Sequence, residues 1–254
     1  MRTPISVALA TRNGSAYLTA QVASILAQLR EGDELIISVD PSNDGTRELA
    51  DHLAANAPAV HVIDGPGQGV AKNFERALDA TRNPHLFLSD HDDVWMPGKV
   101  DEAQKTFAQS GALLIVHDAQ LVDQDLRVIA PSYFRQRGSG PGFLKNLLKN
   151  SYVGACMAFT SNLKDLALPF PSNIPMHDQW LGLLAERYGD VYFLDKPLVR
   201  YRRHKGNATS DTHASLGQMF IWRKDLIQAL YQHERKLDGQ IQLHPNGHTR
   251  RADD

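Results

Sequence analysis

The sequence predicts an α/β protein whose central sheet is mostly parallel. Two observations carry this prediction. Apolar, strand-like segments alternate with helical segments over the first third of the chain, and polar or acidic residues follow each strand directly. This alternation is typical of a parallel sheet with helices on its faces. Beyond residue 110 the strand-like segments shorten, which predicts a smaller mixed region. A chain of 254 residues can form one large domain or two joined halves.

Composition excludes several classes of protein. A formal net charge of −2 argues against a general nucleic-acid binder, which normally carries a clear basic excess. The single cysteine, Cys156, excludes an internal disulfide framework and fits a reducing, cytoplasmic compartment. The apolar segment at the N-terminus is too short for a signal peptide, and no run is long enough to span a membrane. We therefore expect a protein that is soluble or peripheral to a membrane.

The first two strands end in candidate binding residues. Residues 5–10 predict a strand and residues 15–29 a helix, and Thr11 and Asn13 lie in the loop between them, where parallel sheets bind ligands. A plain polar loop explains them equally well. Residues 34–39 predict the second strand. Ser42 and Asp44 suit the caps of the next helix, whereas Asp40 at the strand end can offer oxygens to ribose hydroxyls or a base N–H.

The third strand leads into a glycine-rich loop. Residues 60–63 predict the strand and residues 70–80 a helix, with Lys72 on its first turn, where an anion is favoured. The glycines let backbone amides approach a phosphate. The spacing is not a dinucleotide fingerprint, so a solvent-facing Lys72 stays an open alternative.

The fourth strand ends in an acidic cluster that dominates the sequence. Residues 86–95 begin as a buried strand and then place Asp90, Asp92 and Asp93 within four positions. Carboxylates so crowded must take up protons or share a cation, so we predict a divalent-metal site that holds a diphosphate. A solvated acidic turn is the alternative. Trp95 is predicted to pack beneath the site, and a helix is expected from residue 97 to about 109.

The second half contains shorter elements. Residues 112–116 and 153–159 predict strands, residues 120–129 a hairpin, and residues 143–148 a helix. Residues 131–142, rich in Gly, Pro, Ser and Arg, predict a flexible loop that is either a lid or a linker.

A candidate base and a basic loop follow. A helix is predicted from residue 176 through 184, and Asp178 at its start is either a cap or a general base, with His177 and Trp180 as its supports. Strands are predicted at 191–194 and 198–201. Arg202 and His204 belong to a basic loop that neutralises a pyrophosphate or forms a solvated charge run.

The end of the chain predicts a helix over residues 214–236 that packs on the core. A position on a membrane surface or against a partner subunit, as in a homodimer, is the alternative. Residues 240–254 are predicted to be disordered.

Taken in order, these features resemble the family-2 glycosyltransferases with the GT-A fold, and among them the rhamnosyltransferase-like bacterial members. The resemblance covers residues 5 to about 210. Its matching stretches are Ile5-Ser6-Val7 through Asn13-Gly14, Asp40 with Ser42, Asp44, Gly45 and Thr46, Gly69 with Asn73, the run from Ser89 to Trp95, Gly154-Ala155-Cys156, the run from His177 to Trp180, and Tyr201 to His204 with Asn207.

The resemblance implies inverting transfer of a sugar from a nucleotide-diphosphate donor to an acceptor hydroxyl. Asp40 would contact the nucleotide, Asp90 and Asp92 would serve ribose and a Mn2+ or Mg2+ ion, and Asp93 would lie close by. Asp178 would deprotonate the acceptor. His204 would face the diphosphate or metal from the opposite side. Many relatives carry paired acidic residues where this chain has Val39-Asp40, so the resemblance leaves open how the nucleobase of the donor is recognised.

The expected organisation follows from the resemblance. Residues 1–110 would bind the nucleotide sugar, residues 111–212 the acceptor, and residues 213–254 would form a C-terminal helix and tail. A deoxythymidine-diphosphate sugar such as rhamnose is the favoured donor, and a glycan or lipid-linked glycan at the inner face of the membrane the favoured acceptor. An aspartyl-phosphate hydrolase and a non-catalytic sugar-nucleotide-binding module are the rival interpretations.

Overall fold

The computed structural model describes residues 2–203 and 215–243. Of these, residues 2–170 together with 176–203 form one compact unit, and residues 171–175 together with 215–243 form a second. The strands are β1 (Ile5–Thr11), β2 (Glu34–Val39), β3 (Val60–Asp64), β4 (His85–Asp90), β5 (Val94–Trp95), β6 (Leu114–Val122), β7 (Val128–Ala130), β8 (Met157–Thr160) and β9 (Val191–Arg202).

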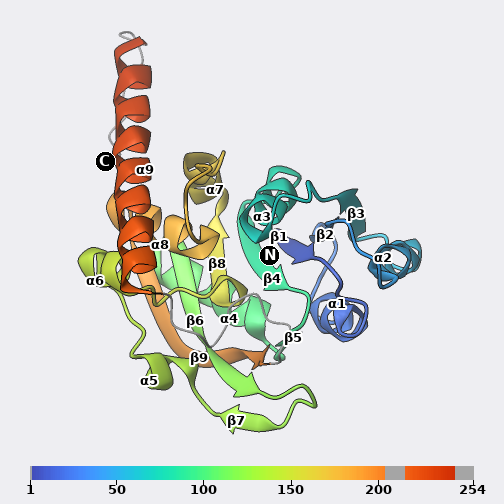
Figure 1. The fold of residues 1–254 in the computed structure, drawn as a ribbon. Coiled ribbons are helices and arrows are strands. Elements are labelled where there is room, and N and C mark those ends of the chain that lie inside the picture. The colour runs from blue at the N-terminus through green and yellow to red at the C-terminus, as the bar shows by residue number, and fades with distance from the viewer. Residues whose placement is uncertain (1, 204–214, 244–254) are drawn as a thin grey trace. The chain divides into compact units, whose positions relative to one another are not determined.

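Along the chain, the helices of the first unit alternate with or follow these strands (Figure 1). They are α1 (Leu18–Leu26), α2 (Thr46–Ala55), α3 (Val70–Asp79), α4 (Lys99–Ser110), α5 (Tyr133–Arg137), α6 (Phe143–Leu148), α7 (Ser161–Ala167) and α8 (His177–Tyr188), with the 3-10 turn η1 (Gly154–Cys156). The second unit contains α9 (Leu216–Leu243).

One sheet organises the first unit. Its strand order is β3-β2-β1-β4-β8-β6-β9-β5, with β7 paired to β6. The strands β1 to β4 are mutually parallel, as predicted. Antiparallel β8 joins β4 to β6, and β6 then pairs parallel with β9. The sheet is therefore parallel at one end and mixed at the other, which confirms the predicted α/β class with a smaller mixed region.

The core lies along the buried strands. Every residue of β1 and β2 is buried, because helices cover both faces of a parallel sheet. Helix α3 packs against β1 and β2, and α2 packs against β3. Among the described residues, no helix is long and apolar enough to cross a membrane.

Several predicted boundaries were wrong. The strand predicted at 153–159 begins only at Met157, because Gly154–Cys156 forms the turn η1, closed by a hydrogen bond from Cys156 N–H to the Val153 carbonyl (2.9 Å). A buried apolar run has the same composition in either conformation. The two strands predicted at 191–194 and 198–201 are one strand, β9. Its register against β6 shifts beside Pro197, where the missing N–H is tolerated.

The segment predicted as a flexible loop, 131–142, contains the short helix α5. Its first N–H groups are capped by two side chains: the Ser132 hydroxyl accepts from Arg135 N–H (3.1 Å), and buried Asp118 accepts from Phe134 N–H (2.9 Å). Whether the segment acts as a lid stays a prediction.

Two further boundaries differ. Helix α1 begins at Leu18 rather than residue 15, and α9 continues to Leu243, so residues 240–243 are helical instead of disordered. The hairpin predicted at 120–129 is confirmed as β6–β7, with Asp123 accepting from Asp125 N–H (2.9 Å) and Arg127 N–H (2.8 Å) in its turn.

Candidate active site

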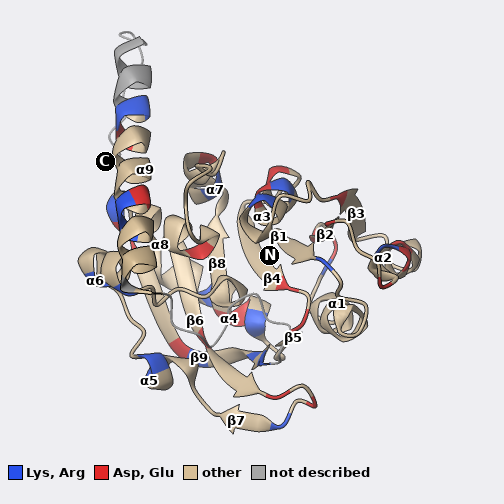
Figure 2. Ribbon diagram, in the orientation of Figure 1, with Lys and Arg blue, Asp and Glu red and all other residues tan. Residues whose placement is uncertain are grey.

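The predicted donor-side residues meet at one edge of the sheet. In the parallel register, Thr11 lies beside Val39 and Ala10 beside Asp90, so β1, β2 and β4 end together (Figure 1). Thr11, Asp40 and Asp90 therefore share one edge, at the carboxyl ends where α/β sheets bind ligands. Figure 2 shows the acidic residues at the end of β4 in red.

Asp40 is held from two sides. It is 3% exposed, its N–H donates to the Thr11 carbonyl (2.9 Å), and its Oδ1 accepts from Gly67 N–H (2.8 Å). A Cβ at Gly65 would lie 2.4 Å from Asp40 Oδ1, so this loop passes the carboxylate only because residue 65 is glycine. The second carboxylate oxygen can serve a ligand.

Two buried polar atoms beside Asp40 have no hydrogen-bond partner within the described part of the chain. They are Thr11 Oγ1 and Asn73 Oδ1. The Asn73 amide nitrogen donates to the Thr11 carbonyl (3.2 Å), so its oxygen is fixed in place. Because buried polar groups are nearly always paired, these atoms fit a bound polar ligand.

Asn13 and Ser42 tie two loops together. Asn13 N–H donates to Ser42 Oγ (3.0 Å), and Asn13 Oδ1 accepts from Asn43 N–H (3.1 Å). The Ser42 hydroxyl also donates to the Asp40 carbonyl (2.8 Å). The prediction that Ser42 caps α2 was therefore wrong, whereas Asp44 does accept from Thr46 N–H (3.1 Å).

The acidic turn after β4 is braced by β9. Asp93 is fully buried, and its Oδ1 accepts from Arg202 N–H (2.8 Å). The Arg202 guanidinium donates to the carbonyls of Asp92 (2.6 Å) and Gln124, and it lies 4.6 Å from the Tyr17 ring centre. Arg202 thus shapes the turn through backbone contacts. Its predicted contact with a diphosphate stays a prediction.

Crowding perturbs the carboxylates as expected. Burial, and then the charges of Asp92 and Asp178, raise the pKa of Asp90 to about 7. Burial, and then the charges of Asp92 and Asp90, raise the pKa of Asp93 well above its usual range. Such groups either hold protons or share a cation.

The residues fit a divalent metal only if a ligand completes its shell. Across residues 2–203 and 215–243, no group of three or more His, Cys, Asp or Glu side chains forms a metal site. Mg2+ commonly uses one or two carboxylates together with substrate phosphates, so Asp90 and Asp92 suit such a shared site. The predicted ligand His204 lies outside the described residues.

Asp178 reaches the same site from α8. It is 8% exposed, and its Oδ1 accepts from Gln179 N–H (2.6 Å) and from the Asn150 amide (3.2 Å). Burial raises the pKa of Asp178 to about 6, against the effect of these hydrogen bonds. Asp178 also bonds to the Gly154 N–H of η1, which packs against β4, and its charge is among those that raise the pKa of Asp90, so Asp178 lies near the acidic turn. A carboxylate with a raised pKa is a stronger base.

The predicted supports of Asp178 differ in role. The His177 ring stacks on Phe74 with centres 4.3 Å apart, and burial lowers the pKa of His177 to about 4, so the imidazole is neutral at pH 7. Its Nε2 is buried and has no partner among the residues described. Trp180 is fully buried and donates to the Ala167 carbonyl (3.1 Å), which is a packing role.

Lys72, on α3, donates to Glu75 Oε2 (2.7 Å) and to the Phe170 carbonyl (3.0 Å). Its predicted contact with phosphate stays a prediction. A phosphate oxygen would have to compete with these two oxygens for the Lys72 ammonium.

Sequence reasoning missed Lys99. This lysine is fully buried, its Nζ donates to the Ala155 carbonyl (2.7 Å), and it lies 4.3 Å from the Trp95 ring centre. Burial lowers the pKa of Lys99 to about 8, while the carboxylates of Asp93 and Asp90 act in the opposite direction. Lys99 thus places a cation beneath the acidic turn. The available signal was a lysine at a helix start, where the helix dipole disfavours a cation.

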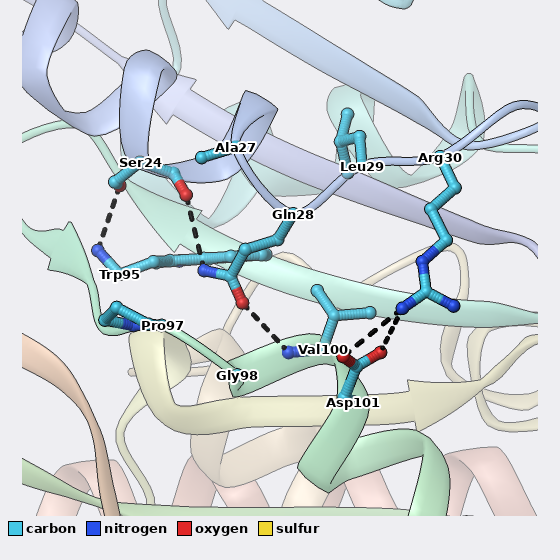
Figure 3. Close-up of a pocket in the computed structure, with 10 residues that line it drawn as sticks. All are labelled: Ser24, Ala27, Gln28, Leu29, Arg30, Trp95, Pro97, Gly98, Val100 and Asp101. Atoms are coloured by element: carbon cyan, nitrogen blue, oxygen red, sulfur yellow. Dashed lines mark hydrogen bonds and ion pairs between the residues drawn. The ribbon is translucent and has the colours of Figure 1, made fainter.

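A cavity of about 360 Å³ lies between the end of α1 and the start of α4 (Figure 3). Its polar groups already bond one another: the Gln28 amide donates to the Met96 carbonyl (3.1 Å), and Arg30 pairs with Asp101 (3.0 Å). The predicted site residues do not line it, so it is not the candidate active site.

Known proteins share both the sequence pattern and the fold. The family model described as glycosyl transferase family 2 matches residues 6–165. The dTDP-rhamnosyl transferase RfbG of Shigella flexneri is 25% identical over 78% of this chain and 72% of its own length. The putative teichuronic acid biosynthesis glycosyltransferase TuaG of Bacillus subtilis is 24% identical over 87% of each.

Solved structures show the same fold. S. aureus TarS, in complex with UDP-GlcNAc, matches with a TM-score of 0.68 at 18% identity, over 87% of this chain and 64% of the TarS chain. The mannosyltransferase PcManGT of Pyrobaculum calidifontis, with GDP-Man and Mn2+, matches with a TM-score of 0.60 at 18% identity, over 93% of this chain and 64% of its own. The predicted GT-A fold is confirmed, and the chain belongs to glycosyl transferase family 2.

Proposed function

We propose that this chain transfers a sugar, with inversion, from a nucleotide-diphosphate donor to an acceptor hydroxyl. The observation that carries the proposal is the position of η1: its Gly154 N–H bonds to Asp178, and η1 packs against β4, which ends in Asp90. The charge of Asp178 is also among those that raise the pKa of Asp90. This supports a base near the residues suited to a diphosphate. An aspartyl-phosphate hydrolase does not account for the family match.

The residues divide the reaction between them. Asp40, with Thr11 and Asn13, would bind the nucleotide, and Asp90 and Asp92 would hold Mn2+ or Mg2+ together with the diphosphate. When bound, the metal would act as a Lewis acid toward the departing diphosphate. Asp178 takes the proton of the acceptor hydroxyl while that oxygen forms its bond to the sugar's anomeric carbon. The bond from that carbon to the diphosphate breaks, and its electron pair leaves with the diphosphate.

Inversion is part of the proposal. If the base and the diphosphate lie on opposite faces of the sugar ring, a single displacement reverses the configuration at the anomeric carbon. His177 is neutral at pH 7, so it would add no charge beside Asp178. A deoxythymidine-diphosphate sugar is the favoured donor, because RfbG bears the name of a dTDP-rhamnosyl transferase. Surface polysaccharide or glycolipid assembly is the proposed setting.

A donor panel tests this function. The full chain is incubated with dTDP-, UDP- and GDP-sugars and a glycan acceptor, with Mn2+, with Mg2+ or with EDTA, and nucleotide diphosphate release and the product's anomeric configuration are measured. We expect release from one donor class, loss of release in EDTA, and an inverted product. A retained configuration would contradict the mechanism. Donor binding without turnover across the panel would instead favour the non-catalytic module.

A further inference from the structure

The segment between β7 and η1 carries an unusual concentration of positive charge. Residues 131–150 contain no Asp or Glu, although the whole chain has a net charge of −2. Its cations are all exposed, and Figure 2 shows those of α5 in blue. The Lys149 Nζ donates to the Arg137 carbonyl (3.5 Å), which joins α5 to the end of α6. The cations are Arg135, Arg137, Lys145 and Lys149.

Two leucines lie among these cations on α6. Leu144 is 71% exposed and Leu148 is 59% exposed. Spaced four residues apart, they lie on the same face of the helix, and each is followed directly by a lysine. The opposite face is anchored, because Asn146 is fully buried and donates to the Gly140 carbonyl (3.0 Å). The orientation of α6 is therefore fixed, with the leucines outward.

Among the described residues, three carboxylates accept hydrogen bonds from this segment: Asp118, Asp178 and Glu186. Asp118 and Asp178 are buried, so neither lies on the exposed face of α6. Glu186 Oε1 accepts from Gly142 N–H (2.9 Å), from the Asn146 amide (3.2 Å) and from the Tyr152 hydroxyl (2.5 Å). These bonds direct the carboxylate to the inner side of α6. The outer face is therefore both basic and apolar.

The same segment holds the proposed base. Gln179 donates its amide to the Asn146 carbonyl (2.7 Å), and Asn150 donates to Asp178 Oδ1 (3.2 Å). A partner bound to α6 would therefore sit against the segment that orients Asp178.

We propose that the α5–α6 surface, formed by Arg135, Arg137, Leu144, Lys145, Leu148 and Lys149, docks on an anionic lipid bilayer. Exposed leucines can enter the boundary between headgroups and acyl chains, while the lysine and arginine head groups contact anionic lipids. Docking there would bring a lipid-linked acceptor to Asp178, and this last step rests on the proposed function. Membrane docking itself does not depend on catalysis.

Vesicle sedimentation of the full chain tests the proposal. Neutral phosphatidylcholine vesicles are compared with vesicles containing about one-third phosphatidylglycerol, at low and at high salt. We expect retention on the anionic vesicles only, weakened by salt. Lys145→Gln with Lys149→Gln should reduce the partition coefficient for anionic vesicles by about thirtyfold, because each cation near such a surface raises that coefficient about fivefold. Leu144→Ser with Leu148→Ser should also release the protein.

Matched variants elsewhere serve as controls. Val128→Ser with Ile129→Ser removes two apolar side chains on β7 that are each 56% exposed, and Lys105→Gln with Lys196→Gln removes two exposed cations. Both should bind vesicles as the wild type does. Equal loss in these controls, or no binding by the wild type, would overturn the proposal. The proposal would also be overturned if vesicle binding were lost only in the α9 variant Phe220→Ser with Ile227→Ser. Equally tight binding to soluble polyglutamate would overturn it as well, because that result would indicate an acidic polymer as partner.

A second measurement separates this proposal from the proposed function. Transfer to a short soluble acceptor should be unchanged in the α6 variants, while transfer to a vesicle-bound acceptor should fall with their partitioning. A wild type that binds vesicles but transfers no sugar would contradict only the function. A wild type that transfers sugar but ignores vesicles would contradict only the docking surface.

Discussion

The two sides of the active site are assembled in different ways. On the donor side, Thr11, Asp40 and Asp90 lie beside one another because β1, β2 and β4 are parallel and in register. On the acceptor side, Asp178 is positioned by Asn150, by η1 and by α6, which no common strand register relates. The donor side should therefore tolerate changes in remote packing, whereas the acceptor side should respond to them.

The largest expected effect is on the acceptor side. Asp178→Asn keeps an acceptor for Gln179 N–H but removes the base, so we expect transfer to fall by a factor of about 100 to 10,000. Donor affinity, measured by calorimetry, should change less than about twofold, because the donor-side contacts are intact. Asp165→Asn, an exposed carboxylate on α7, is the control. Near-normal turnover in Asp178→Asn would refute its role as base.

On the donor side we expect the opposite pattern. Asp40→Asn keeps the oxygen that accepts from Gly67 N–H but removes the charge offered to the nucleotide. Donor affinity should fall about tenfold, while the rate at saturating donor stays nearly constant. Asp64→Asn, at the end of neighbouring β3, should change neither quantity. A fall in the saturated rate alone would show that the two sides are not separable in this way.

Lys99 connects the two sides. Its ammonium lies beneath the acidic turn and bonds to Ala155, next to the Gly154 amide that contacts Asp178. Lys99→Met should lower the free energy of unfolding by about 1–3 kcal/mol, because the Ala155 carbonyl loses its buried donor. Hydrogen exchange should rise in residues 153–156, and the saturated transfer rate should fall with little change in donor affinity.

The matched control for Lys99 is Lys164→Met, because Lys164 also donates to a backbone carbonyl, that of Thr81 (3.1 Å), near the opposite end of β4. It should destabilise the protein without changing the transfer rate of the folded enzyme. Equal rates in the two variants would reduce Lys99 to a packing role.

The smallest effects concern pH. Asp178 must be ionised to accept a proton, so transfer should decline as the pH falls through about 6. Stability should change in the opposite sense. The pKa of Asp178 is raised from 3.8 to about 6 on folding, so the folded protein binds this proton more tightly than the unfolded chain does. Raising the pH through that window therefore destabilises the wild type relative to Asp178→Asn.

Paired melting curves of wild type and Asp178→Asn, recorded without metal between pH 4 and pH 8, measure this difference. The variant should gain stability relative to the wild type as the pH rises. A difference that does not vary with pH would contradict the raised pKa.

Most of the donor side could be predicted from the sequence because it depends on local patterns. The alternation of strands and helices placed Thr11, Asp40 and Asp90 at strand ends, and a parallel sheet then leaves them one edge to share. Ser42 is an exception on the donor side. Ser42 was predicted to cap a helix, yet it bonds to Asn13 of another loop, a contact between segments that no local pattern encodes.

The acceptor side was less predictable for the same reason. An Asp at a helix start is a cap by local criteria, and only the charge interaction with Asp90 favours Asp178 as a base. Lys99 was not predicted as a site residue, because its burial beneath the acidic turn depends on the Ala155 carbonyl that η1 supplies. The apolar composition of residues 153–159 cannot distinguish that turn from a strand.

The sequence by itself determined the α/β class, the family and the set of carboxylates, because periodicity and motif order are local properties of the chain. The tertiary structure decided which carboxylates share a site, which cation lies beneath them, and which face of α6 is exposed. These properties depend on burial and on charges brought together from distant segments. Burial and such charges raise the pKa of Asp90 and of Asp178 only after the chain has folded.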